Sequence, residues 1–162
     1  MINNPTTLLI SVHTKYVQLM MDGIKTVELR KVKPRIKPGD FVLIYECAPK
    51  KRLSALFAVK NITSGSITEL WREVQDSAGV SFEEFQNYYH KSSLGYGIWL
   101  EHIKTFSYKL TLEEVRKVWH DFRPPQSYYY LRGEDISLLE NLIQDPIISS
   151  TVHSRQEVLF SA

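Results

Sequence analysis

The stretch GIKTVELRK, residues 23–31, decides how the rest of this sequence is interpreted. Successive side chains of a strand point to opposite faces, so residues two apart share a face. Val27 and Leu29 are therefore predicted to face a core. Glu28 and Arg30 lie side by side on the other face, with Cα atoms about 7 Å apart. The lysine two positions after the glycine precedes the pleat, and its ammonium is within reach of the glutamate. This charged group is either an exposed ion pair, worth about 0–1 kcal/mol, or part of a binding site.

The composition bounds the class of protein. A length of 162 residues with 43% hydrophobic and 23% charged residues is typical of one soluble domain. We expect residues 1–145 to form that domain and residues 146–162 to be a peripheral tail. No apolar run approaches the roughly 20 residues of a membrane-spanning helix, so no membrane partner is expected. Cys47 is the single cysteine, which excludes an internal disulfide framework. These features favour a cytoplasmic location.

Motifs for metals, cofactors and common nucleophiles are missing from the sequence. The five histidines show no metal-ligand spacing with each other or with Cys47. There is no Gly-rich phosphate loop and no G-x-S-x-G nucleophile elbow. The sequence therefore predicts neither a metal site nor a cofactor. A small cysteine near the end of an apolar strand is typical of a packed, unreactive thiol.

Positive charge gathers in two segments although the net charge is only +2. Residues 30–37 hold five cations and no acid, and the segment PKKR at 49–52 adds three more. From residue 134 onward acids outnumber bases. Such a distribution favours a polyanionic partner, although solvated loops also carry lysines without any partner. The residues expected to follow a nucleic-acid backbone are Lys31, Lys33, Arg35, Lys37, Lys50, Lys51 and Arg52.

Hydrophobic periodicity predicts the element order β-α-β-β-β-αα-β-α-β-α. A serine or threonine precedes three of the helical segments, and the spacing of Ser81 and Glu84 fits a capping box. Gly23 is placed to end the first helix. Repeated β-α-β alternation is missing, so a small mixed sheet or barrel with helical additions fits best. Strands are predicted at 8–12, 26–30, 40–46, 53–63, 95–106 and after the proline pair 124–125, and helices at 13–23, 66–74, 81–89, 111–119 and 133–143.

Three segments follow one another along the chain: SVHTKYVQLMMDGIKTVELRKVKPRIKPGDFVLIYECAP, then GYGIWL, then FRPPQSYYYL. Together with G-x-K-x-x-E-x-R at Gly23, Lys25, Glu28 and Arg30, they resemble the ASCH domain of the PUA-like superfamily over residues 8–131. The resemblance implies an α+β fold, a PUA-like small mixed β-barrel with flanking helices. It also implies a cleft between the barrel and its first helix, lined by the signature residues. Proteins of this kind include readers of RNA or modified bases, hydrolases acting on acylated cytidine, nucleases and transcription regulators.

The first hypothesis is an RNA- or nucleotide-binding protein, acting in RNA metabolism or in the regulation of transcription or translation. Glu28 can accept a hydrogen bond from an exocyclic amine, as acids do with cytosine N4. Lys25 and Arg30 can pair with a phosphate or a base carbonyl. Tyr45 and the tyrosines 128–130 can stack on bases or pack on the barrel. The residues expected to bind this RNA, nucleotide or modified base are Lys25, Glu28, Arg30, Ser11, His13, Tyr45, Gln126 and Ser127.

A second hypothesis is a small hydrolase, either an N4-acylcytidine amidohydrolase or a ribonuclease, with Lys25 and Glu28 as catalytic residues. In the amidohydrolase branch of the family that this chain resembles, a threonine nucleophile stands at the position of Glu28, so that nucleophile is absent here. Glu28 can instead act as a general base toward water, with Lys25 or Arg30 stabilising the oxyanion.

A third hypothesis is an interaction protein in gene regulation. Its protein partner would bind the acidic last helix or the aromatic residues of the helical segments, namely Trp71, Phe85, Tyr88 and Tyr89. Aromatic side chains at helical spacing are more often core. Under the first hypothesis, replacing Glu28 by alanine is expected to weaken ligand binding and to leave thermal stability nearly unchanged.

Overall fold

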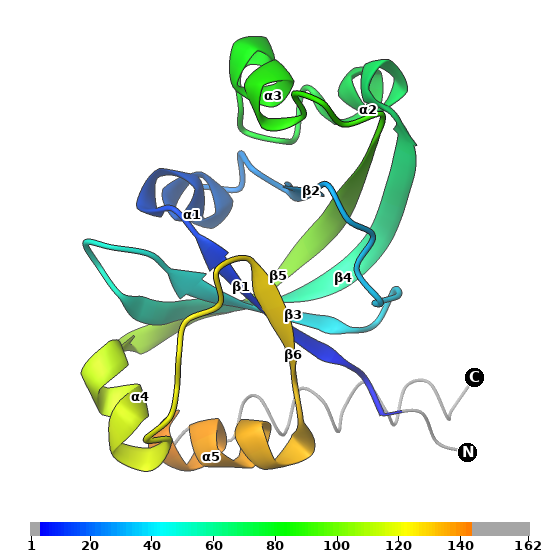
Figure 1. The fold of residues 1–162 in the computed structure, drawn as a ribbon. Helices are drawn as coiled ribbons and strands as arrows, with labels where there is room; N and C mark the ends of the chain where they lie inside the picture. The colour runs from blue at the N-terminus through cyan, green and yellow to red at the C-terminus, as the bar shows by residue number, and fades with distance from the viewer. Residues whose placement is uncertain (1–3, 144–162) are drawn as a thin grey trace.

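The computed structural model describes residues 4–143, apart from the side chains of 107–109 and 140–143. Within these residues a mixed sheet of six strands curls into a half-barrel flanked by five helices, an α+β fold (Figure 1). The strands are β1 (Thr7–Val12), β2 (Val27–Arg30), β3 (Phe41–Glu46), β4 (Arg52–Ser66), β5 (Leu94–Thr111) and β6 (Tyr128–Leu131). The helices are α1 (Thr14–Met21), α2 (Ile67–Val74), α3 (Phe82–Tyr88), α4 (Leu112–Val118) and α5 (Gly133–Ile143).

The strands lie side by side in the order β2-β5-β4-β3-β1-β6. β1 pairs in parallel with β3, and the other neighbouring pairs are antiparallel. Residues 41–46 and 53–59 of the two central strands are all buried. Strands that are covered on both faces read as nearly continuous apolar runs. This explains the sequences FVLIY and LSALFAV.

The two long strands β4 and β5 produce the curl of the sheet. Their register shifts at three places between residues 53 and 61. Irregularities of this kind bend a strand and increase its twist. The curl brings the two edge strands toward each other: Arg30 Nη1 at the end of β2 donates to Ser127 Oγ, just before β6, at 2.8 Å. A side-chain hydrogen bond thus joins the two edges of the half-barrel.

The described residues contain three hydrophobic clusters. Odd- and even-numbered residues of a strand point to opposite faces of the sheet and so belong to different clusters. Even-numbered residues of β1 and β3 pack with α1 on one face, and odd-numbered residues pack under α4 and α5 on the other. Figure 1 shows α1 and these two helices on opposite sides of the sheet. Val27 and Leu29 belong to a third cluster with buried residues of α2 and α3. The prediction that these two side chains of the signature strand face a core is confirmed.

The predicted order of elements is also confirmed. Capping boxes begin α2, α3 and α4, with Ser66, Ser81 and Thr111 as N-caps, and Gly23 follows α1 with a φ of 72°. The predicted tail 146–162 lies outside the described residues. No helix in residues 4–143 is long and apolar enough to cross a membrane.

Candidate functional site

Lys25, Glu28 and Arg30 form one buried ionic group, here named the signature triad. Lys25 Nζ lies 3.5 Å from Glu28 Oε2, and Arg30 Nη2 donates to Glu28 Oε1 at 2.9 Å. The three side chains are between 3% and 11% exposed. The alternative of an exposed ion pair is therefore wrong. One carboxylate lies between two cations, largely removed from water.

The connection between α2 and α3 holds the lysine of the triad. Lys25 Nζ donates to the carbonyl oxygens of Val27 at 2.8 Å and Ala78 at 2.7 Å. Gly79 permits this close approach, because a Cβ at that position would lie 2.9 Å from Lys25 Cβ and its φ is 64°. Burial lowers the pKa of Lys25 from its ordinary value, and the charge of Glu28 opposes that shift. Perturbed ammonium groups of this kind are common at functional sites.

The arginine of the triad has an unused hydrogen-bond donor. Its Nη atoms donate to Glu28 and to Ser127, and its guanidinium lies 5.8 Å from the centre of the Tyr128 ring. Arg30 Nε is buried and has no hydrogen-bond partner among the described residues. An unsatisfied buried donor is destabilising by about 1–3 kcal/mol, so an acceptor that reached this atom would be favoured.

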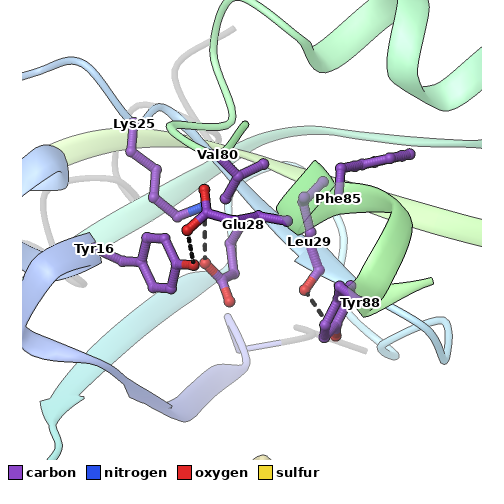
Figure 2. Close-up of a pocket in the computed structure, with 8 residues that line it drawn as sticks. Tyr16, Lys25, Glu28, Leu29, Val80, Phe85 and Tyr88 are labelled. Atoms are coloured by element: carbon purple, nitrogen blue, oxygen red, sulfur yellow. Dashed lines mark hydrogen bonds and ion pairs between the residues drawn. The ribbon is translucent and has the colours of Figure 1, made fainter. Parts of the chain in front are cut away.

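A pocket of about 100 Å³ opens beside the triad, between α1, β2 and α3. We call it the base pocket. Carboxylate and ammonium groups lie close to aromatic rings in its wall. In Figure 2 the Lys25 side chain and the Tyr16 ring point toward Glu28, while Tyr88 lies on the other side with its hydroxyl near the Leu29 carbonyl. The lining residues are Tyr16, Lys25, Glu28, Leu29, Val80, Glu84, Phe85 and Tyr88.

A polar clasp joins α1 to α3 at the base pocket. Glu84 Oε1 accepts hydrogen bonds from Lys15 Nζ and, at 3.4 Å, from the Tyr16 hydroxyl. Glu84 Oε2 accepts from the Ser81 backbone N–H at 2.8 Å and so caps α3. The bond from Lys15, followed by the cap, lowers the pKa of Glu84 to about 2. Glu84 is therefore negatively charged at neutral pH. It places a second carboxylate in the pocket wall.

The structure brings two of the predicted serines close to the triad. Ser127 accepts the hydrogen bond from Arg30. The Ser11 backbone N–H donates to the Ser127 carbonyl at 3.1 Å, and the Ser11 hydroxyl donates to the Pro125 carbonyl at 2.6 Å. Ser11 thus holds the segment that carries Ser127.

The remaining predicted ligand-binding residues are not part of the triad. His13 is exposed and precedes α1 without a side-chain capping bond, and Gln126 is exposed next to Ser127. Tyr45, expected to stack on a base, is 3% exposed and packs in the core under α4 and α5, 6.1 Å from the Phe122 ring. Its odd number on β3 turns it away from α1, and burial raises its pKa.

The thiol of Cys47 is half-buried, and burial raises its pKa. A raised pKa reduces the thiolate fraction on which reactivity depends. Within the described part of the chain, no three His, Cys, Asp or Glu side chains gather in a way that could hold a metal ion.

The structure places the two predicted basic segments at opposite ends of β3. Lys31, Lys33, Arg35 and Lys37 lie in the loop from β2 to β3, and Lys50 and Lys51 lie in the turn from β3 to β4. Arg52 Nε donates to Glu46 Oε2 at 2.8 Å, and Glu46 is 2% exposed. Arg52 therefore neutralises a buried acid, which sequence reasoning did not foresee. The two basic segments are therefore separated by the length of β3.

Sequence reasoning missed the far wall of the base pocket. Tyr16 falls within the helix predicted at 13–23, and Glu84 is predicted only as a capping residue. Their partners are 68 or 69 residues away in the chain, so no local pattern links them. Phe85 and Tyr88 are part of an amphipathic helix, for which core packing is the ordinary interpretation. Phe85 and Tyr89 are indeed 1–2% exposed, which removes them from the protein-docking surface of the third hypothesis.

Comparison with known proteins identifies the relatives of this chain. The ASCH domain model matches residues 10–109. A protein from Zymomonas mobilis named "ASCH domain-containing ribonuclease" is 24% identical over 133 residues, which cover 82% of this chain and 89% of that protein. The crystal structure of ASCH from Zymomonas mobilis has a TM-score of 0.78 at 24% identity and covers 84% of this chain and 94% of its own. The large ribosomal subunit protein uL22 of Ureaplasma parvum is 24% identical over 127 residues, 78% of this chain and 39% of that protein.

Proposed function

Since this chain belongs to the ASCH domain family, we propose that it binds RNA and takes one nucleobase into the base pocket. The composition of the pocket carries the proposal. A carboxylate and an ammonium, held by the signature triad, meet aromatic side chains in one small concavity. Single-stranded RNA is read in this way, by stacking on aromatic rings and by hydrogen bonds to base edges.

The polar groups of the pocket favour a base with both an amine and a carbonyl. Glu28 and Glu84 can accept hydrogen bonds from an exocyclic amine. The contact of Lys25 Nζ with Glu28 is its longest, at 3.5 Å, against 2.8 and 2.7 Å to the two backbone carbonyls. A base carbonyl that accepted a hydrogen bond from Lys25 Nζ would therefore replace the contact with Glu28 more readily than the bonds to the backbone carbonyls. Cytosine and guanine present both groups, whereas uracil lacks the amine.

The size of the pocket limits what enters it. A volume of about 100 Å³ is below the roughly 300–1,000 Å³ of sites for drug-sized ligands. It admits one ring system. The ribose and the phosphates of an RNA strand would remain outside, where solvent and surface cations surround them.

Replacing Tyr88 by alanine is expected to weaken binding of hexacytidylate by about 5- to 150-fold, because stacking of a base on an aromatic ring is worth about 1–3 kcal/mol. The Tyr88 ring forms one wall of the pocket. Fluorescence anisotropy of a labelled oligonucleotide measures the dissociation constant. Wild-type protein is also expected to bind hexacytidylate more tightly than hexauridylate, which offers no amine.

Phe82→Ala is the matched control for this experiment. Phe82 lies on the same helix, is 50% exposed, and packs on Trp71 outside the pocket lining. We expect the affinity of this variant to equal that of the wild type. Equal losses of affinity in both variants would indicate that α3 is disturbed. An unchanged affinity in Tyr88→Ala would show that the base does not bind in this pocket.

RNA cleavage is a second candidate function, favoured by the name of the Zymomonas mobilis relative. Catalysis of phosphodiester cleavage needs a proton acceptor near the attacking oxygen and a donor near the leaving oxygen. Glu28 and Lys25 could supply these roles, and the lowered pKa of Lys25 eases proton release. Arg30 would stabilise negative charge on the phosphate.

If the chain cleaves RNA, Lys25→Met is expected to abolish the cleavage of hexacytidylate, because it removes the proton donor and leaves the Glu28–Arg30 pair in place. Gel or chromatographic separation of the products measures the rate. Lys117→Met, an exposed change on α4, is the control and should cleave at the wild-type rate after the same purification. Cleavage that persists in Lys25→Met would exclude this residue from the mechanism.

A further inference from the structure

The loop from β2 to β3, residues 31–40, is built to hold cations on one side. Pro34 and Ile36 are buried, while the basic residues at 33, 35 and 37 are exposed. The C-terminal end of the loop is fixed by Asp40, which is 2% exposed. Its Oδ1 accepts from the Thr6 backbone N–H at 2.9 Å and its Oδ2 from the Lys37 backbone N–H at 2.8 Å. Because buried residues alternate with exposed basic residues, the three basic side chains leave the loop on the same, solvent-facing side.

These charges surround a second concavity, here named the loop hollow, with a volume of about 450 Å³. This volume falls in the range of about 300–1,000 Å³ that is typical of ligand sites. Asp40 is the one carboxylate in its lining, and both of its oxygens are already hydrogen-bonded to backbone amides. The three basic side chains thus dominate the charge around the hollow. Its lining residues are Thr6, Lys33, Pro34, Arg35, Ile36, Lys37 and Asp40.

A row of neighbouring cationic and aromatic groups connects the loop hollow to the signature triad. The Arg30 guanidinium lies 5.8 Å from the centre of the Tyr128 ring, and the Tyr128 and Tyr130 rings are 5.9 Å apart. The Arg35 guanidinium lies 5.4 Å from the centre of the Tyr130 ring. The Arg35 backbone N–H also donates to the Tyr130 hydroxyl at 2.6 Å. The loop is therefore attached to β6 at the position where the row enters the hollow.

Two further features lie near the base pocket and the signature triad. Lys31 Nζ lies 4.8 Å from the centre of the Tyr88 ring, which is a wall of the base pocket. At the triad end of the row, the buried Nε of Arg30 lacks a hydrogen-bond partner in the part of the chain that the structure describes. An anionic oxygen is the acceptor that an arginine donor favours most.

We infer that the loop hollow is a phosphate subsite for the RNA strand whose base occupies the base pocket. This inference rests on the proposed function and extends it. The strand would leave the base pocket past Arg30 and follow the row of Tyr128 and Tyr130. Its phosphodiester groups would then reach Lys33, Arg35 and Lys37 in the loop hollow. The site is therefore expected to bind an oligonucleotide more tightly than a free nucleoside.

Neutralising the hollow tests this inference. The loop variant Lys33→Gln/Arg35→Gln/Lys37→Gln removes three charges from exposed positions. The control variant Lys60→Gln/Lys91→Gln/Lys117→Gln removes the same charge from exposed positions on β4, on the segment after α3 and on α4. Binding of cytidine and of labelled hexacytidylate is measured for both variants and the wild type over a series of salt concentrations. The melting temperature of each variant is recorded alongside.

The loop variant is expected to bind hexacytidylate at least tenfold more weakly at low salt and to bind cytidine with wild-type affinity. Each phosphate contact with a single strand contributes about 0.7 to the slope of log K against log salt concentration. The slope for hexacytidylate is therefore expected to fall by about 2 in the loop variant and to fall less in the control. A melting temperature within about 2 °C of the wild type would show that the fold is intact.

The possible failures are distinguishable. Equal hexacytidylate affinity and salt slope in the loop and control variants would overturn the phosphate subsite, while cytidine binding would leave the base pocket in place. Conversely, a loss confined to the loop variant, with no cytidine binding by the wild type, would support the subsite and overturn the base pocket. If the wild type binds neither probe, both proposals are wrong.

Discussion

Replacing Glu28 by alanine is expected to lower the free energy of unfolding by about 3–5 kcal/mol, the range for removing one partner of a buried ionic group. Glu28 accepts from Arg30 at 2.9 Å and lies 3.5 Å from the Lys25 ammonium. Without the carboxylate, two buried cations face each other with no negative charge between them. The expectation from sequence alone, that this substitution leaves thermal stability nearly unchanged, applies to an exposed pair. Because the triad is buried, we expect a loss instead.

Urea unfolding at pH 7, followed by circular dichroism, measures this loss. Glu73→Ala is the control, because Glu73 is an exposed residue of α2. A substitution of that kind usually changes stability by no more than about 0.5 kcal/mol. A loss of less than about 1 kcal/mol in Glu28→Ala would contradict the reading of the triad as a buried network.

The pH dependence of the same variant gives an independent readout. Burial already lowers the pKa of Lys25, and Glu28 is the group that opposes the shift. Between the lowered pKa of the folded state and the ordinary value of 10.5, the folded protein binds fewer protons than the unfolded chain, so stability rises with pH. Removing Glu28 widens this window. The difference in stability between wild type and Glu28→Ala is therefore expected to shrink as the pH rises from 7 toward 10.

Features that depend on neighbouring residues were predictable from the sequence. Strand periodicity alone placed Val27 and Leu29 in a core and put Glu28 and Arg30 on the other face, as the structure has them. The capping box of Ser81 and Glu84 is likewise a contact over three residues. Such patterns are fixed by backbone geometry, which does not depend on the rest of the fold. The order of strands and helices followed from the same reasoning.

Features that depend on contacts between distant segments were not predictable. Lys25 is buried because Ala78 and Gly79 pack against it, 53 residues along the chain. Tyr45 is predicted at the cleft because it lies near the end of its strand. A side chain there can point to either face of the sheet, and only the assembled sheet shows that Tyr45 points toward α4 and α5. The row from Arg30 to Arg35 exists because the curl of β4 and β5 brings the two edges of the sheet together.

Stability and binding at the triad can be separated by replacing all three charged side chains together. Lys25→Met/Glu28→Leu/Arg30→Met fills similar volume with apolar groups. Replacing a complete buried ionic group by packed apolar residues is often neutral, or stabilising by about 1–4 kcal/mol. Two backbone carbonyls lose the hydrogen bonds from Lys25 Nζ, which costs about 1–3 kcal/mol for each that stays unsatisfied.

The triple variant is therefore expected to be more stable than Glu28→Ala and to stay within about 2 kcal/mol of the wild type. It should nevertheless lose cytidine binding, because no carboxylate or ammonium remains at the floor of the base pocket. Hexacytidylate should still bind weakly and with a salt dependence, since Lys33, Arg35 and Lys37 keep their charge. Equilibrium dialysis with cytidine and anisotropy with hexacytidylate measure the two effects. Wild-type cytidine affinity in this variant would show that the triad does not contact the base, and would place the base on another part of the surface.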